Sequence, residues 1–181
     1  MLKWFIRKRI AGFERAYDYD TRYMREMLDA STRGFMRFAK VMELSQHCED
    51  TPAEAWFAAK LATTLSEDCG PCTQLVVKMA EQAGVRAEVL RGIIGGDIGL
   101  MGADAALAYR YAKTALTYDP ANDALREEIQ RRWGPRAVVT LALAVTSARM
   151  YPTLKYALGH GKTCTRVRVG DAELVPHAAA A

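Results

Sequence analysis

The chain has 181 residues, half of them hydrophobic, and a net charge of +4, so it can bury one proper core. Its four cysteines are too few for the disulfide framework of a small secreted domain. Charges interrupt the first thirteen residues, and the longest strongly apolar run, 137–145, is too short to span a bilayer. We therefore expect a protein of the cytoplasm, where cysteines stay reduced unless they take part in a redox cycle.

Residues 1–17 are expected to form a basic amphipathic segment ahead of the main domain. Its cations are Lys3, Arg7, Lys8, Arg9 and Arg15. Trp4 and Phe5 beside these cations are compatible with contact to a membrane surface, but packing against the domain or a second subunit is the simpler interpretation. The modest net charge gives no reason to expect a nucleic-acid partner.

Apolar residues at helical spacing predict an all-α domain of about seven or eight helices over residues 18–160. Helices are expected from Asp20 or Thr21 to about residue 44, with an interruption at Ser31 to Gly34. Another is expected from Thr51 to about Leu65. Thr51 is the predicted cap of this helix, with Pro52 in its first turn.

The second half of the chain continues this pattern. Further helices are expected at residues 86–94, 103–117, 121–133 and 136–158, the last with a kink at Pro152. Residues 136–150 are apolar nearly all round, as expected of a central or interface helix. In the tail, 161–181, we expect one extended segment within 163–169, and a disordered end from His177 onward.

The strongest candidate for a chemically reactive site is the CxxC motif Cys69-Gly70-Pro71-Cys72. They lie on an apolar helical stripe formed by Leu65, Cys69, Cys72, Val76, Met79 and Ala83. Pro71 favours a helix start, where unpaired N–H groups and the helix dipole lower the pKa of a nearby thiol. Glu67 and Asp68 oppose this effect by like charge, but they could accept or return a proton. Catalytic, metal-binding and structural roles all stay open for the pair.

Two other contexts for the cysteines are less favoured. Thioredoxins carry the same four residues, but their motif follows a strand, whereas residues 53–65 are Ala-rich and helix-periodic. Zinc could be held by Cys69 and Cys72 with His160 and Cys164, or by a half-site at His47-Cys48. The long separation of these half-sites argues against a metal, and no cofactor is expected.

The order of an Ala-rich helix, an acidic residue, a CxxC pair, a second helix and AxxxGV resembles the alkylhydroperoxidase D-like, or carboxymuconolactone decarboxylase, superfamily. The matching residues are Ala58-Ala59, Glu67-Asp68, Cys69–Cys72 and Ala80–Val85, and the resemblance covers about 52–158. It implies an all-α homo-oligomer (a dimer, trimer or hexamer) that acts as a thiol-dependent peroxidase or disulfide oxidoreductase. The implied partners are a hydroperoxide or disulfide substrate and a thiol reductant. The resemblance also implies that Cys72 is the peroxidatic nucleophile and Cys69 its resolving partner.

This chain departs from the family at two positions. The peroxidases carry a His four residues after the second cysteine and a Glu twelve residues before the first, where this chain has Val76 and Phe57. Glu54, one helical turn before Phe57, and Glu67 are the candidates for a rebuilt proton relay. The alternative is a non-catalytic oligomeric relative with structural or vestigial cysteines. Decarboxylase activity is not expected, because no His-based site is evident.

Overall fold

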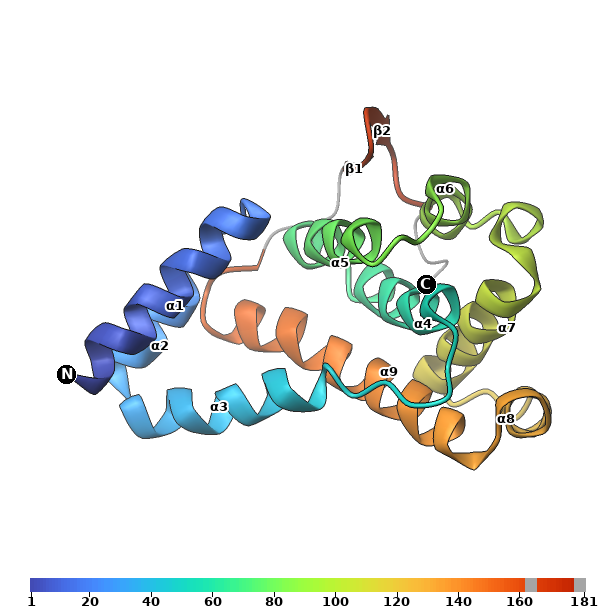
Figure 1. The fold of residues 1–181 in the computed structure, drawn as a ribbon, viewed down its shortest axis with the longest axis horizontal. Helices are drawn as coiled ribbons and strands as arrows, with labels where there is room; N and C mark the ends of the chain where they lie inside the picture. The colour runs from blue at the N-terminus through green and yellow to red at the C-terminus, as the bar shows by residue number, and fades with distance from the viewer. Residues whose placement is uncertain (162–165, 178–181) are drawn as a thin grey trace.

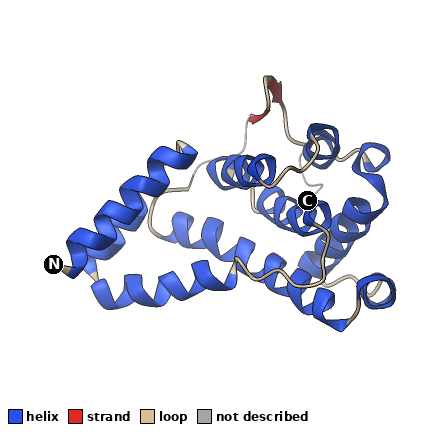
Figure 2. Ribbon diagram, in the orientation of Figure 1, coloured by secondary structure: helices blue, strands red, loops and turns tan. Residues whose placement is uncertain are grey.

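The computed structural model describes residues 1–161 and 166–177, and these residues are mostly helical (Figures 1 and 2). The helices are α1 (Leu2–Tyr17), α2 (Arg22–Ala30), α3 (Thr32–Leu44), α4 (Ala53–Ser66), α5 (Gly70–Gln82), α6 (Ala87–Gly95), α7 (Ile98–Thr117), α8 (Asn122–Trp133) and α9 (Pro135–Ala157). The strands are β1 (Val167–Val169) and β2 (Ala172–Leu174), which form one antiparallel hairpin. The all-α prediction is confirmed, with nine helices in the described part of the chain.

Helices α1, α2 and α3 share a hydrophobic cluster of their own at one end of the molecule, which we call the N-terminal unit (Figure 1). Its buried members are Ile10, Tyr19, Tyr23, Met24, Leu28, Phe35 and Phe38. The predicted interruption at Ser31 is confirmed, because Ser31 separates α2 from α3 and its hydroxyl accepts a hydrogen bond from Gly34 N–H (2.9 Å). Leu75, Tyr151 and Leu154 pack against this cluster, so α5 and the end of α9 attach the unit to the rest of the fold.

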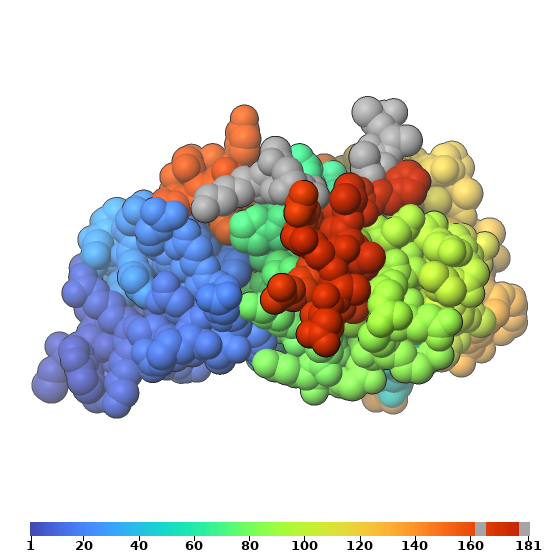
Figure 3. Space-filling view, turned by 90° about the horizontal axis from the view of Figure 1, so that it is seen from above, coloured from blue at the N-terminus to red at the C-terminus, as the bar shows by residue number. Residues whose placement is uncertain are grey.

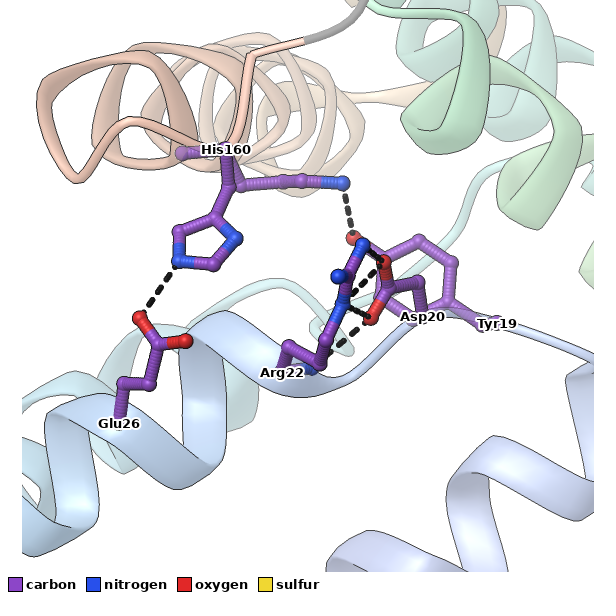
Figure 4. Close-up of polar contacts among 6 residues, drawn as sticks. Tyr19, Asp20, Arg22, Glu26 and His160 are labelled. Atoms are coloured by element: carbon purple, nitrogen blue, oxygen red, sulfur yellow. Dashed lines mark hydrogen bonds and ion pairs between the residues drawn. The ribbon is translucent and has the colours of Figure 1, made fainter.

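Polar contacts also join α2 to the end of α9. The imidazole Nε2 of His160 lies 2.7 Å from a carboxylate oxygen of Glu26, and Arg22 pairs with Asp20 nearby (Figure 4). Lys155, buried at the end of α9, donates a hydrogen bond to the hydroxyl of Tyr19 (3.3 Å). Burial raises the pKa of Tyr19 to about 12, so this hydroxyl keeps its proton at neutral pH.

The larger core is formed by α4 to α9, with α4 in contact with α5, α6, α7 and α9. Small residues on α4 allow this close approach, since Ala55, Ala58, Ala59 and Ala62 are almost completely buried. Burial of these surfaces supplies the main favourable term in folding. The packing fixes the direction of α4, and therefore the position of the cysteines that follow its last turn.

Helix α9 runs without interruption through Pro152 (Figure 1). By length and composition it is the one helix among residues 1–161 and 166–177 that could cross a bilayer, and slightly under half of it is buried inside the fold. The structure packs it against α3, α4, α7 and α8. The same apolar composition is expected of a core helix.

The structure differs from the sequence-based predictions at the start of α4 and in the tail, and the predicted cap at Thr51 is wrong. Thr51 does not cap α4, because the helix begins at Ala53 and the hydroxyl of Thr51 instead donates to the carbonyl of Glu49 (2.8 Å). In the tail, the predicted extended segment is confirmed for Val167–Val169, which form β1, but the second strand β2 and its pairing with β1 were not predicted. The predicted tail residues 163–165 and the terminal alanines lie outside the described residues.

The hairpin lies over α5 and α6 (Figure 3). The Gln74 side chain accepts from Arg168 N–H (2.7 Å) and donates to the carbonyl of the same residue (3.0 Å). The prediction of a disordered His177 is also wrong, because its N–H donates to the carbonyl of Ile94 (2.9 Å). These hydrogen bonds to backbone groups of the tail attach it to α5 and α6, and no local sequence pattern predicts them.

Gly96, the residue that directly follows α6, allows a test of the contact between the tail and α6. Its φ is +71°, and an added Cβ would lie 2.9 Å from the ring of His177. We expect Gly96→Ala to lower the free energy of unfolding by about 1–2 kcal/mol, because it adds left-handed strain and displaces the tail. Urea denaturation measures this loss. Gly95→Ala is the control, since a Cβ there meets nothing within 4 Å; equal stability of the two variants would contradict the prediction.

Candidate active site

The two cysteines lie at the junction of α4 and α5. Helix α4 ends at Ser66, and Asp68 then takes a left-handed backbone conformation with φ of 47°. Asp tolerates this conformation better than most residues. Cys69 follows in extended conformation as the residue before α5, and Cys72 falls in the first turn, as predicted from Pro71.

Backbone hydrogen bonds hold this junction. The N–H of Cys69 donates to the carbonyl of Thr64 (3.3 Å), and the carbonyl of Cys69 accepts from the N–H of Thr73 (2.9 Å). The first N–H groups of any helix have no partner within the helix. Cys72 therefore lies where a thiolate would be stabilised by the positive end of the α5 dipole.

Cys69 and Cys72 are joined by a disulfide, with their Cα atoms 5.3 Å apart. Each residue is only 4% exposed. The fold therefore holds the CxxC pair predicted from the sequence at disulfide distance. The low exposure means that only a small reagent reaches the sulfurs without local movement of the protein.

Glu67 lies beside the cysteines in the chain and is paired with a residue of α9. Its carboxylate is 2.7 Å from Nε of Arg149, and its side chain is 19% exposed. The ammonium of Lys113 on α7 contacts the hydroxyl of Ser66 (3.4 Å). Two cations from distant helices thus contact the end of α4, in the segment that directly precedes Cys69.

Glu54 lies in the first turn of α4, at the other end of that helix from the cysteines. At 1.5 Å rise per residue, the 14 residues of α4 span about 20 Å. Both carboxylate oxygens of Glu54 accept hydrogen bonds from Arg86 (2.8 and 3.1 Å), and these bonds lower the pKa of the carboxyl. The fold does not bring Glu54 to the cysteines, whereas it places Glu67 and Asp68 directly before them.

The two positions that hold His and Glu in the resembling family are apolar and packed here. Phe57 is 5% exposed and belongs to the larger core, and Val76 packs against that core. The side chain of Gln74, two residues before Val76, forms hydrogen bonds with the backbone of Arg168 on β1. None of these three side chains offers an acid or base to the disulfide.

A groove of about 700 Å³ lies between α7 and α9. Its walls are largely apolar and include Leu116, Tyr118, Val145 and Met150. Arg149 lines this groove and also pairs with Glu67. The ion pair therefore connects the groove to the segment that carries the cysteines.

The described residues contain no group of three or more His, Cys, Asp or Glu side chains that could hold a metal ion. Of the zinc ligands considered from the sequence, Cys69 and Cys72 are disulfide-bonded and His160 contacts Glu26. Cys48 is exposed, and its sulfur lies 3.8 Å from the carbonyl of Thr51. The fourth considered ligand, Cys164, lies outside the described residues.

Sequence reasoning missed Arg149 and Lys113. Both come from helices far along the chain, and neither belongs to a motif. The one available signal is that each interrupts an otherwise apolar or Ala-rich helix with a cation. Comparisons with protein families, with curated proteins and with solved structures found no match for this chain.

Proposed function

We propose that this chain is a thiol–disulfide oxidoreductase that reduces hydroperoxides with Cys72 and Cys69, in the manner of the alkylhydroperoxidase D-like superfamily. The observation that carries the proposal is the Cys69–Cys72 disulfide at the first turn of α5, within an all-α fold. A dithiol there alternates between two states without any cofactor. Assembly into a homo-oligomer and residence in the cytoplasm stay predictions.

The cycle begins with the reduced pair. The Cys72 thiolate attacks the outer oxygen of the hydroperoxide, the O–O bond breaks, and the products are a Cys72 sulfenic acid and an alkoxide that takes up a proton. The Cys69 thiol gives up its proton and its sulfur attacks the Cys72 sulfur, the S–O bond breaks, and the hydroxide that leaves takes up that proton to become water as the disulfide forms. An external thiol reductant returns two electrons and two protons to the pair.

Glu67 is the carboxylate we propose for the proton to the leaving oxygen. It directly precedes Asp68 and Cys69, and the guanidinium of Arg149 holds it in place (2.7 Å). This arrangement takes the place of the relay whose family positions hold Val76 and Phe57. Glu54 receives no role in this proposal, because Arg86 engages it at the far end of α4.

A structural disulfide is the second candidate. The observation that favours it is burial, since both cysteines are 4% exposed and apolar residues occupy the relay positions. In the chain-entropy model a bridge between residues three apart stabilises the fold by about 2 kcal/mol. A purely structural bridge would form without consuming peroxide in repeated turnovers.

The test uses a variant with Cys48→Ser and Cys164→Ser, which leaves Cys69 and Cys72 as the two cysteines of the chain. Reduced protein is mixed with hydrogen peroxide or a small organic hydroperoxide, and peroxide loss, free thiols and the Cys69–Cys72 disulfide are followed together. We expect one disulfide formed per peroxide consumed, and continued turnover with a dithiol reductant. The proposal fails if peroxide is not consumed faster than by the reductant alone.

The same assay tests the proton carrier. Glu67→Gln keeps the size of the side chain but removes the acid, so we expect sulfenic acid formation to slow by about 10²-fold. Glu54→Gln is the matched control on the same helix and should react at the unmodified rate. Equal rates for both variants would remove Glu67 from the mechanism and leave the dithiol proposal intact.

A further inference from the structure

Helix α1 has one side against the N-terminal unit and the opposite side toward solvent. At 100° per residue, the inward side is formed by Ile6, Ile10, Phe13 and Tyr17. The solvent-exposed remainder of the helix, which we call the outward side, includes Trp4, Phe5, Lys8 and Arg15, with Arg9 exposed at its edge. The helix is therefore amphipathic in an unusual way, since its solvent side combines large aromatic residues with cations.

The aromatic part of the outward side is strongly exposed. Trp4 is 60% and Phe5 57% exposed, and their rings contact each other with centroids 4.9 Å apart. Leu2, 59% exposed, adds to the patch at the start of the helix. The start of the chain, dark blue in Figure 3, projects from one end of the molecule. Adjacent exposed apolar side chains of this size mark a surface for interaction.

The charged part of the outward side is entirely basic. The Lys8 ammonium lies 5.6 Å from the centre of the Trp4 ring, and Arg9 and Arg15 are exposed. The one acidic residue of α1, Glu14, is paired with Arg25 of α2. A negatively charged partner therefore meets no repulsion from the outward side.

The charge of the whole chain is concentrated in this part of the molecule. Residues 1–44 contain ten basic and six acidic residues, whereas residues 45–181 contain fifteen of each. The net charge of +4 therefore comes from residues 1–44, which contain α1, α2 and α3. Such a distribution directs this end of the molecule toward a negative surface.

We propose that the outward side of α1 binds the surface of an anionic lipid bilayer. Trp4 and Phe5 enter the headgroup boundary, while Lys8, Arg9 and Arg15 contact lipid phosphate and carboxylate groups. A bilayer surface offers an apolar layer directly beneath a negative one, which matches the aromatic pair and its flanking cations. A nucleic acid offers the charge without the apolar layer. The docked inward side stays in place, so binding requires no unfolding of the N-terminal unit.

Co-sedimentation of the full chain with vesicles tests this proposal. We expect binding to phosphatidylcholine vesicles that contain phosphatidylserine, and little binding to phosphatidylcholine alone. Trp4→Ser with Phe5→Ser should weaken binding by at least about tenfold, because it removes the apolar contact. Lys8→Gln with Arg9→Gln should also weaken it about tenfold or more, since each cation near such a surface contributes about 1 kcal/mol.

A matched pair of substitutions controls for net charge. Arg91→Gln with Arg110→Gln removes two exposed cations from α6 and α7 and should leave binding unchanged. Circular dichroism verifies that each variant keeps its helices. The proposal is overturned if this control weakens binding as much as the Lys8 and Arg9 pair, if the aromatic pair has no effect, or if a DNA duplex at equal phosphate concentration binds as tightly as the vesicles.

Discussion

Cys72→Ser, made in the background that lacks Cys48 and Cys164, is expected to abolish peroxide turnover, a loss on the order of 10³-fold or more. The physical reason is that a serine hydroxyl at neutral pH is not the anion that attacks the O–O bond, whereas the α5 dipole favours the thiolate form of a cysteine in the first turn. Initial rates of peroxide loss in the presence of a dithiol reductant measure this effect.

Cys69→Ser separates the two roles of the pair. Cys72 can still react once in this variant, but no neighbouring thiol closes the disulfide. We expect one equivalent of peroxide to be consumed, with a Cys72 sulfenic acid that is trapped by dimedone and detected by mass. A sulfenic acid on Cys69 in the Cys72→Ser variant, at a comparable rate, would reverse the assigned roles.

The stability of the same variants distinguishes the structural alternative. Both serine variants remove the bridge, so both should lose about 2 kcal/mol relative to the oxidised protein and little relative to the reduced one. If both are destabilised in this way while the parent protein shows no peroxide turnover, the disulfide is structural. Activity and stability therefore report on the two candidate functions independently.

Lys60→Met is expected to raise the free energy of unfolding by about 2 kcal/mol at pH 7. Lys60 is 8% exposed, and it forms no ion pair with an acidic residue among residues 1–161 and 166–177. Its ammonium donates to the carbonyl of Ser45 and lies 3.5 Å from the centre of the Trp56 ring. These contacts only partly replace lost hydration, so burial lowers the pKa of Lys60 to about 8.

The sign of the pH dependence follows from this pKa. The unfolded chain keeps the Lys60 proton up to about pH 10.5, and the folded chain loses it above about pH 8. The unfolded state therefore binds more protons between these values, and the free energy of unfolding rises with pH across this window. A methionine removes the charged group and fills a similar volume, so its stabilising effect is constant below pH 8 and disappears above pH 10.5.

Urea denaturation at several pH values between 7 and about 10.5 measures the difference between Lys60→Met and the parent protein. Lys40→Met is the control, because Lys40 is well exposed and its substitution should change stability by less than about 0.5 kcal/mol. Destabilisation by Lys60→Met at every pH would mean that the contacts with Ser45 and Trp56 outweigh the cost of burying the charge.

The sequence by itself determined the features that depend on neighbouring residues. Helical spacing of apolar side chains predicted the all-α fold, because one buried stripe per helix must repeat every three to four residues. Pro71 placed the CxxC pair at a helix start, and a separation of three positions at a helix start leaves the two sulfurs close enough to bond. The composition of residues 1–17 indicated a basic amphipathic segment, and only the structure showed that Trp4 and Phe5 face solvent.

Only the tertiary structure decided which distant groups meet. It paired Glu67 with Arg149 of α9, and it placed Glu54 with Arg86 at the far end of α4. It also laid the hairpin on α5 through Gln74 and buried Lys60 without a carboxylate. These outcomes depend on how whole helices cross and pack, and helices separated by many residues leave no local pattern that fixes their contacts. The cysteine pair could therefore be identified from the sequence, whereas the residues that surround it could be identified only from the tertiary structure.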